Sequence, residues 1–234
     1  MFRAVRSLFG GESKSFRRLR FERAVRLFAF EFVVVLLGVL AAQMLQERFT
    51  DARERGAAKS AMDRARSETS GFRSTADYWR SAAPCLDRNM DALMRSVAAS
   101  KTIDPALTAR PRMPLTALTP WGEDTIGAAR QVYGDSMVSA FFALQTMAAK
   151  MSRDSDDLAG EWALLSLVDP SLGPISSEDR INARVAAGRI KGRLESLEVS
   201  AENAERISDS LGIAADPVRR RVLTLPQGCS ELRR

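Results

Sequence analysis

Small and apolar residues recur in alternating steps of four and three along the middle of the chain. The positions that share this spacing are Ala58, Met62, Ala65, Thr69, Phe72, Ala76, Trp79, Ala83, Leu86, Met90, Leu93 and Val97. This is the a/d spacing of helices that pack along a common seam. Because Pro84 interrupts the pattern, we expect one helix to end near Ala82 and a second to run from Pro84 to about Ala99.

A second seam of the same kind follows about a hundred residues later. Its positions are Ala183, Ala187, Ile190, Leu194, Leu197, Ala201, Ala204, Ser208 and Leu211. The stretch Ser176-Ser177-Glu178-Asp179 predicts a capping-box start for this helix, and Gly212 predicts its end. Because both seams lie in one chain, we interpret them as two long helices of one bundle; a coiled coil between two copies is the alternative.

The residues between the seams predict shorter elements. Residues 101–120 read as a loop over the bundle because they contain Pro105, Pro111, Pro114 and Pro120. No segment has the alternation of a strand, so the predicted fold class is all-α: one N-terminal transmembrane helix followed by an extramembrane helical bundle.

Three helices are expected after this loop. Thr119-Pro120 predicts an N-cap and first helical position, with the helix ending at Gly134. A second helix should begin at Asp135, with Val138, Phe141, Phe142, Leu144, Ala148 and Met151 facing inward. A third should cover about 156–167 and carry Trp162 and Leu165.

The transmembrane prediction rests on residues 27–45, where Glu31 and Gln43 are the only strongly polar positions. A helical span needs about 20 largely apolar residues, and residues 27–46 provide them. The alternatives are a cleaved signal peptide, for which Val39-Leu40-Ala41 offers a usable cleavage site, and a buried core helix. The basic flank and the continuing helical pattern favour an uncleaved span.

Charge sets the expected orientation. The chain carries a formal net charge of +6, but residues 1–46 hold eight bases and three acids, whereas the remainder holds 27 bases and 26 acids. The basicity is therefore a property of the N-terminal tail, which argues against nucleic-acid binding. The positive-inside rule predicts a cytoplasmic tail (1–26), a transmembrane helix (27–46) and a periplasmic helical bundle (47–234).

Residues 30–42, FEFVVVLLGVLAA, resemble the opening span of a family of uncharacterised single-span bacterial inner-membrane proteins. In that family an acid precedes a Val/Ile/Leu run that contains glycine, and a helical extramembrane region follows. The resemblance implies a bacterial inner-membrane protein and implies no activity.

Two features inside the span are candidate contacts with another membrane helix. Glu31 is either an interfacial acid that reaches the headgroups or a polar contact to a partner within the membrane. Gly38 and Ala42 form a small-xxx-small pattern, which lets two spans approach closely and which also occurs by chance.

Few catalytic arrangements are open to this chain. It has no histidine, so catalytic triads with histidine and histidine-ligated metals are excluded, and its two cysteines cannot build a thiolate zinc site. No phosphate-binding loop, nucleophile elbow or dinucleotide fingerprint is present. We therefore predict no catalytic, cofactor-binding or metal-binding residues.

Cys85 and Cys229 are predicted to form a disulfide, because both follow the span and the compartment is expected to be oxidising. Two unpaired thiols are the alternative. The loop closed would contain 145 residues, for which the chain-entropy model gives about 5 kcal/mol. The first helix would place Cys85 about 55 Å from the membrane, so we expect the last helix to run in the same direction as the first. An antiparallel last helix would need a long extended tail to bring Cys229 to Cys85.

Two acidic features of the sequence are candidate sites. Asp154, Asp156, Asp157 and Glu161 form a cluster that either coordinates a hard cation or caps the start of a helix, and we favour the cap. Glu161 beside Trp162 fits an acid in an apolar pocket, but no partner carboxylate is identifiable, so we favour a surface acid beside a core tryptophan.

The expected function is a membrane-tethered interaction or scaffold module of the bacterial envelope, without catalysis. Its partners would be the lipid bilayer and a membrane or envelope protein, with a homodimer as an alternative. The second hypothesis is a periplasmic small-molecule sensor or accessory subunit that signals through a membrane partner. The third is a carboxylate-based enzyme.

Overall fold

The computed structural model describes residues 14–114, 117–223, 225 and 229, with the backbone alone for residues 14–25. All regular elements in this part of the chain are helices, so the predicted all-α class is confirmed. The chain divides into two compact units, Met1–Glu54 and Arg55–Arg234. Helix α1 (Lys14–Ala98) begins in the first unit and continues into the second.

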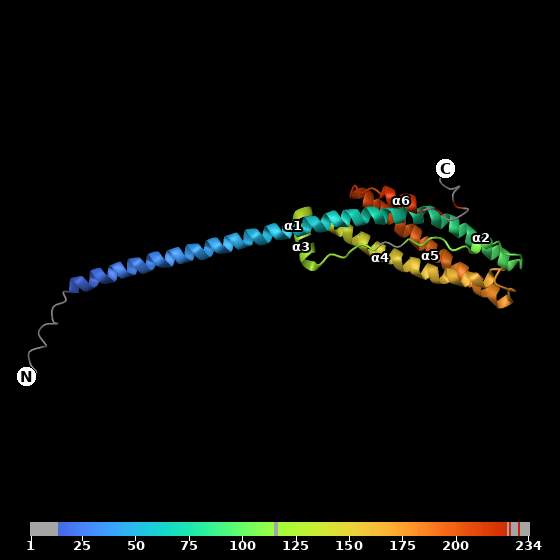
Figure 1. Cartoon of the computed structure of the whole chain (residues 1–234), viewed down its shortest axis with the longest axis horizontal. Coiled ribbons are helices and arrows are strands. Elements are labelled where there is room, and N and C mark those ends of the chain that lie inside the picture. The colour runs from blue at the N-terminus through green and yellow to red at the C-terminus, as the bar shows by residue number, and fades with distance from the viewer. Residues whose placement is uncertain (1–13, 115–116, 224, 226–228, 230–234) are drawn as a thin grey trace, which may run out of the picture. The chain divides into compact units, whose positions relative to one another are not determined.

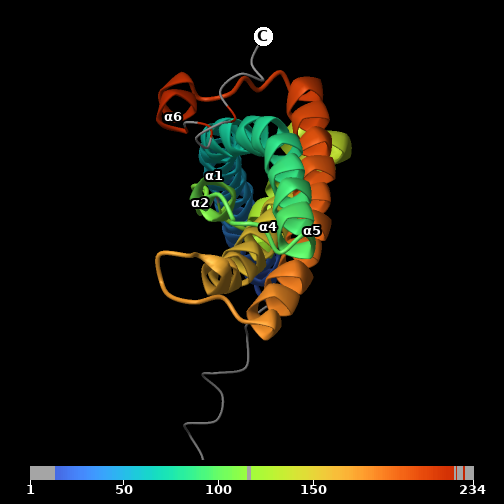
Figure 2. The same ribbon diagram turned by 90° about the vertical axis from the view of Figure 1, so that its right-hand side faces the viewer.

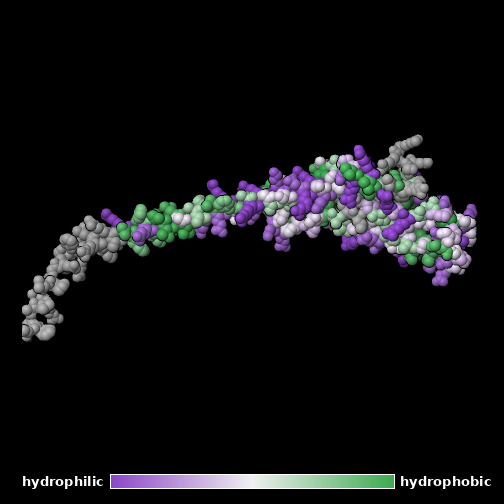
Figure 3. All heavy atoms as spheres, in the orientation of Figure 1, coloured by the Kyte–Doolittle hydropathy of each residue, from purple (hydrophilic) through white to green (hydrophobic). Residues whose placement is uncertain are grey.

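In the first unit, α1 carries the apolar segment predicted from the sequence. Every large apolar side chain from Leu27 to Leu45 is exposed, and none of the segment is buried against protein (Figure 3). This contradicts the alternative of a core helix. The helix is long and apolar enough to cross a membrane, a property that signal sequences share.

The second unit is a bundle of three long helices (Figure 1): the second part of α1, α4 (Asp135–Leu164) and α5 (Ser177–Ser210). Ion pairs give the direction of α5. Lys191 Nζ lies 2.6 Å from Asp91 Oδ1, whereas Arg80 pairs with Glu205 near the other end of α5. Helix α5 is therefore antiparallel to α1.

Helix α4 runs in the same direction as α1. Ala58 shares a small apolar cluster with Val138 near the start of α4, and Leu86 lines a cavity together with Trp162 near its end. Helix α3 (Glu123–Tyr133) precedes α4 and contributes Ala128 and Ala129 to the same small cluster.

The two predicted seams form the core of this bundle. All twelve positions of the first seam and eight of the nine positions of the second are buried, with Leu211 partly buried at the end of α5. Full burial of an aliphatic or aromatic side chain contributes about 1.5–3 kcal/mol. The interpretation of the seams as one intramolecular bundle is confirmed.

The predicted helix break at Pro84 is wrong, since α1 continues through this residue to Ala98. A proline removes the donor for the carbonyl of residue 80. Arg80 and Pro84 are both exposed, so water can reach this side of the helix. The buried neighbours Ala83 and Leu86 keep the helix packed against the bundle across the defect.

Two helix starts also differ from the prediction. Helix α3 begins at Glu123 after Gly122 rather than at Pro120, because Thr119 instead binds Glu68 of α1 through its backbone N–H (2.8 Å) and hydroxyl (2.7 Å). The two helices expected over 135–151 and 156–167 are one helix, α4, which ends in the short 3-10 helix η1 (Leu165–Val168).

Other predicted helix ends are correct. Ser176 and Asp179 form the reciprocal capping box at the start of α5. Gly134 follows α3 and Gly212 follows α5, both with positive φ (85° and 66°), a conformation that glycine adopts without the penalty a Cβ brings.

Because α1 and α4 are parallel, the connection between them must return along the whole bundle. We call residues 99–114 and 117–122 the proline strap. The part of α1 from Ala58 to Ala98 is about 60 Å long. The whole connection, residues 99–122, has 24 residues, which can cover this distance as extended backbone (about 80 Å) but not as a helix (about 36 Å). Apart from α2 (Pro105–Thr108), the strap has no helix, and its prolines favour this extended backbone.

Replacing Leu194 by alanine should lower the free energy of unfolding by about 2–5 kcal/mol, because Leu194 is fully buried in the α5 seam. The matched control is Val199→Ala on the exposed face of the same helix, which should change it by less than about 0.5 kcal/mol. Chemical denaturation of the full chain in detergent, followed by circular dichroism, measures both. Equal losses of unfolding free energy in the two variants would contradict the burial of the α5 seam in the bundle.

Candidate functional site

After α5 the chain turns back along α1. We call residues 213–223 together with 225 and 229 the C-terminal strap. Arg73 donates a hydrogen bond to the carbonyl of Ile213 (2.6 Å), and the Ser70 hydroxyl donates to the carbonyl of Ala214 (2.8 Å). The N–H of Asp216 donates to the carbonyl of Ser70 (3.1 Å). The strap is thus bound to α1 mainly through its own backbone.

The strap contains one short helix, α6 (Pro217–Val222), which Asp216 caps by accepting from the N–H groups of Val218 and Arg219. Arg219 crosses α1 at Gly71, where a Cβ would lie 3.1 Å from its Nη1 atom. The missing side chain at Gly71 is therefore what allows Arg219 to pass this close to the helix. Figure 2 shows α6 and α2 on the outside of the bundle, next to α1.

A disulfide between Cys85 and Cys229 fixes the end of the C-terminal strap, with the two Cα atoms 5.7 Å apart. Both residues are buried. The disulfide was predicted correctly, but the predicted direction of the last long helix is wrong. Helix α5 is antiparallel to α1, and the C-terminal strap covers the return distance that brings Cys229 to Cys85.

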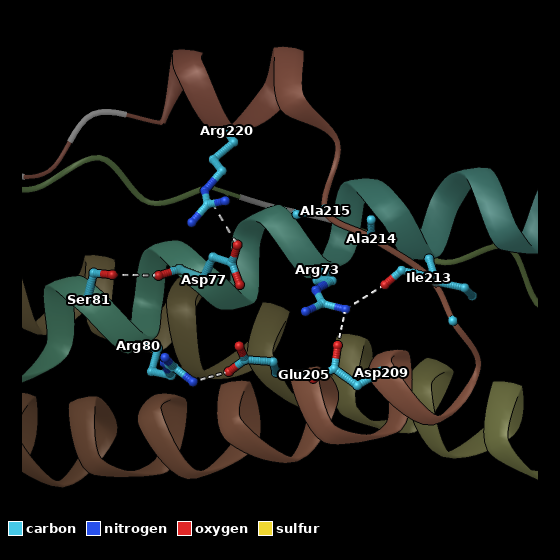
Figure 4. Close-up of a pocket in the computed structure, with 11 residues that line it drawn as sticks. Arg73, Asp77, Arg80, Ser81, Glu205, Asp209, Ile213, Ala214, Ala215 and Arg220 are labelled. Carbon is cyan, nitrogen blue, oxygen red and sulfur yellow. Dashed lines mark hydrogen bonds and ion pairs between the residues drawn. The ribbon is translucent and has the colours of Figure 1, made fainter. Parts of the chain in front are cut away.

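A polar groove of about 520 Å³ lies between α1, the end of α5 and the C-terminal strap (Figure 4). Three ion pairs line it: Arg73 with Asp209, Arg80 with Glu205, and Arg220 with Asp77 at 3.7 Å. Gly212, just after α5, and Ala214 and Ala215 of the C-terminal strap line the strap side of the groove. Their small size leaves the groove open.

The polar groups of this groove are engaged with one another or with the backbone. Its three arginines and three carboxylates balance one another, so it fits a polar or dipolar group. Ser81, the only hydroxyl among the groove's lining residues, donates to the carbonyl of Asp77 (2.9 Å). A hydroxyl bound in this way has no base to activate it as a nucleophile.

A second cavity, of about 250 Å³, lies where the two straps meet. Leu86, Leu107, Trp162 and Leu225 form the apolar part of its lining, and Asn89, Arg110 and Arg112 form the polar part. Trp162 donates from Nε1 to the carbonyl of Thr108 (3.0 Å), which holds the proline strap against α4.

Tyr78 and Arg112 join the two straps to α1. The buried Tyr78 hydroxyl donates to the carbonyl of Arg112 (2.7 Å), and Arg112 Nη1 donates to the carbonyl of Val222 (3.3 Å). Burial raises the pKa of Tyr78 to about 12, with the Arg112 charge opposing it, so the hydroxyl remains a donor throughout the physiological pH range.

The predicted contacts in the apolar segment of α1 belong to the first unit and are not among the residues that line these cavities. Glu31, Gly38 and Ala42 are all exposed, and nothing lies within 4 Å of a Cβ built at Gly38. Gly38 and Ala42 are four residues apart and therefore share one face of α1.

The acidic cluster is not a helix start, so its interpretation as a cap is wrong. Asp154 lies inside α4 and is buried, where it pairs with Lys150 (2.8 Å) and Arg193 (3.0 Å) and accepts from the Ser196 hydroxyl (2.7 Å). Asp157 pairs with Arg193 as well. Bases from two helices neutralise the cluster and clamp α4 to α5, and within the described residues no three acids or cysteines gather as a metal site would require.

Glu161 pairs with Arg189 of α5 (3.3 Å), and Trp162 is buried. The interpretation of Trp162 as a core residue is confirmed.

The hydrophobic pattern of the sequence does not predict the C-terminal strap, although the strap carries two recognisable local signals. Asp216-Pro217 is an N-cap followed by proline at the first helical position, and Gly212 marks the turn before it.

Comparisons of the chain with protein-family models, with curated proteins and with solved structures find no match.

Replacing both cysteines by alanine should lower the free energy of unfolding by about 2–5 kcal/mol, because the disulfide closes a loop of more than a hundred residues. Denaturant titration of the oxidised wild type and the double variant measures the difference. The reduced wild type serves as control and should match the variant. Identical unfolding midpoints with and without reductant would contradict a stabilising disulfide.

Replacing Asp154 by asparagine should lower the free energy of unfolding by about 1–3 kcal/mol at neutral pH. Burial raises the pKa of Asp154, but its hydrogen bonds with Lys150, Ser196 and Arg193 outweigh this and hold the pKa below its ordinary value. The contribution is therefore complete above the unfolded pKa of about 3.9 and is lost as pH falls through the lower folded pKa.

Denaturation curves at several pH values test this clamp, with Asp156→Asn on the exposed side of α4 as the matched control. The difference between wild type and Asp154→Asn should shrink in acid. A pH-independent difference, or an equal effect of Asp156→Asn, would show that the charge of Asp154 is not what stabilises the fold.

Proposed function

We propose that this chain is a single-span protein of the bacterial inner membrane whose periplasmic helical bundle binds a partner and catalyses no reaction. Residues 1–26 would lie in the cytoplasm, 27–46 in the bilayer and 47–234 in the periplasm. The observation that carries the proposal is the Cys85–Cys229 disulfide in the same chain as a fully exposed apolar helix. Disulfides persist in oxidising compartments outside the cytoplasm.

Binding is favoured over catalysis by the polar groups of the bundle. The charged side chains of the groove pair with one another, and those of the acidic cluster pair across α4 and α5. The two straps provide irregular backbone on the outside of a rigid bundle, which is where binding residues are concentrated in many folds.

The polar groove supports a second candidate function, a sensor for a small ligand. Its volume of about 520 Å³ lies in the range of small-molecule sites. A sensor of this kind would pass its signal to another membrane protein. Glu31, Gly38 and Ala42 are the residues of the span suited to that contact.

Cysteine labelling in a Gram-negative host tests the topology. A polymer-linked maleimide should modify Leu172→Cys, introduced into a Cys85→Ser/Cys229→Ser background, once the outer membrane is permeabilised, because Leu172 is highly exposed in the bundle. The matched control, Ser13→Cys in the basic tail, should react only after the inner membrane is broken. Gel shifts report both reactions.

Two outcomes would overturn the proposal. Modification of Leu172→Cys only after the inner membrane is broken would place the bundle in the cytoplasm. A shortened protein that lacks the Ser13→Cys label and washes off the membrane would show that the apolar segment is a cleaved signal.

A further inference from the structure

We propose that the two straps together form a docking surface for an acidic polypeptide segment of a partner protein, an inference that rests on the binding function proposed above. The surface consists of five arginines, which we call the arginine ridge: Arg110, Arg112, Arg219, Arg220 and Arg221. The first two come from the proline strap and the others from α6 of the C-terminal strap.

Contacts on the outside of α1 bring these arginines together although they are a hundred residues apart in the sequence. Arg112 donates to the carbonyl of Val222 at the end of α6. Arg110 and Arg112 line the same cavity as Leu225 of the C-terminal strap. Arg220 reaches Asp77 on α1, next to Tyr78, which holds the carbonyl of Arg112.

The straps are basic, whereas the helices behind them are acidic. The described residues of the two straps hold six bases and two acids, and α4 and α5 together hold eight bases and twelve acids. Both strap acids are engaged as helix caps: Asp104 accepts from the N–H of Ala106 (2.9 Å), and Asp216 caps α6. The positive charge of the straps is therefore concentrated on the ridge.

Several ridge arginines are available to a partner. Arg110 and Arg221 are exposed and form no ion pair within the described part of the chain. The Arg220 side chain is 63% exposed and its partner Asp77 lies 3.7 Å away, so an incoming carboxylate can share this guanidinium group with Asp77.

The residue types identify the chemistry of the partner. All five ridge residues are arginines, whose planar guanidinium groups bind carboxylates through two parallel hydrogen bonds. Val218 and Val222 lie one turn apart on α6 and are 69% and 60% exposed, so they give the ridge a small apolar contact. A segment in which Asp or Glu alternates with aliphatic residues matches both features.

A membrane surface fits less well. Interfacial helices carry large residues such as Trp, Phe and Leu on their apolar side, whereas α6 offers two valines on a helix of six residues. We therefore assign the ridge to a protein partner and make lipid binding an outcome of the test.

The experiment measures binding of a fluorescein-labelled peptide of alternating glutamate and leucine to the full chain in phosphatidylcholine nanodiscs, by fluorescence anisotropy. Arg110→Glu/Arg221→Glu should raise the Kd about tenfold or more, because two exposed guanidinium groups are replaced by groups with the same charge as the peptide. The milder Arg110→Gln/Arg221→Gln should raise it less. The same peptide with glutamine in place of glutamate should bind weakly to the wild type.

The matched control is Arg153→Glu/Arg184→Glu, which changes the net charge equally at exposed positions of α4 and α5 outside the ridge. It should bind like the wild type. The basic N-terminal tail is the same in every variant, so the difference between the two double variants reports the ridge alone. Circular dichroism confirms that each variant is folded.

Equal affinity of the ridge variant and the control variant would overturn the inference. So would binding of the wild type to phosphatidylglycerol vesicles, lost in the ridge variant, without binding of the peptide, since the ridge would then be a lipid site. Because these measurements use purified protein, they are independent of the labelling in cells. If the ridge does not bind the peptide, the topology measured by labelling still stands. If the labelling contradicts the topology, the measured affinity is unchanged.

Discussion

The parallel arrangement of α1 and α4 is the constraint on which the rest of this bundle depends. Two parallel helices cannot be joined by a short turn, so the chain must return along the part of α1 that lies in the bundle before α4 begins. The proline strap makes this return in extended form, held by Trp162 and by the Thr119–Glu68 contact. Only then can α5 complete the core by running antiparallel to both helices.

The sequence predicts the core well because the core depends on local periodicity. The seam positions follow from the spacing of small and apolar residues, and the capping box at Ser176 follows from four adjacent residues. The predicted helix breaks at Pro84 and before Asp156 are wrong, because tertiary contacts there outweigh the local preference of the sequence to end a helix. Packing on both sides of Pro84 keeps α1 intact, and ion pairs from Arg193 of α5 hold the polar stretch around Asp154 in a helix.

The candidate site could not be predicted in the same way, because it depends on which segments lie side by side. The sequence favours a parallel last helix because it gives the shorter path to Cys85, whereas the chain uses the long tail that an antiparallel α5 requires. Gly71 illustrates the difficulty: its role is visible only once Arg219 is placed against it. Backbone hydrogen bonds between Ser70 and residues 214–216 leave no pattern in the sequence either.

The disulfide also determines what happens when the chain is cut. Cys85 lies before the proline strap and Cys229 at the end of the C-terminal strap, so both exposed connections fall within the covalent loop. A single proteolytic nick in either strap therefore separates no fragment from the molecule. The piece that carries the core of α5 stays attached to the piece that carries the apolar helix, and a nicked protein in an oxidising compartment retains all of its parts.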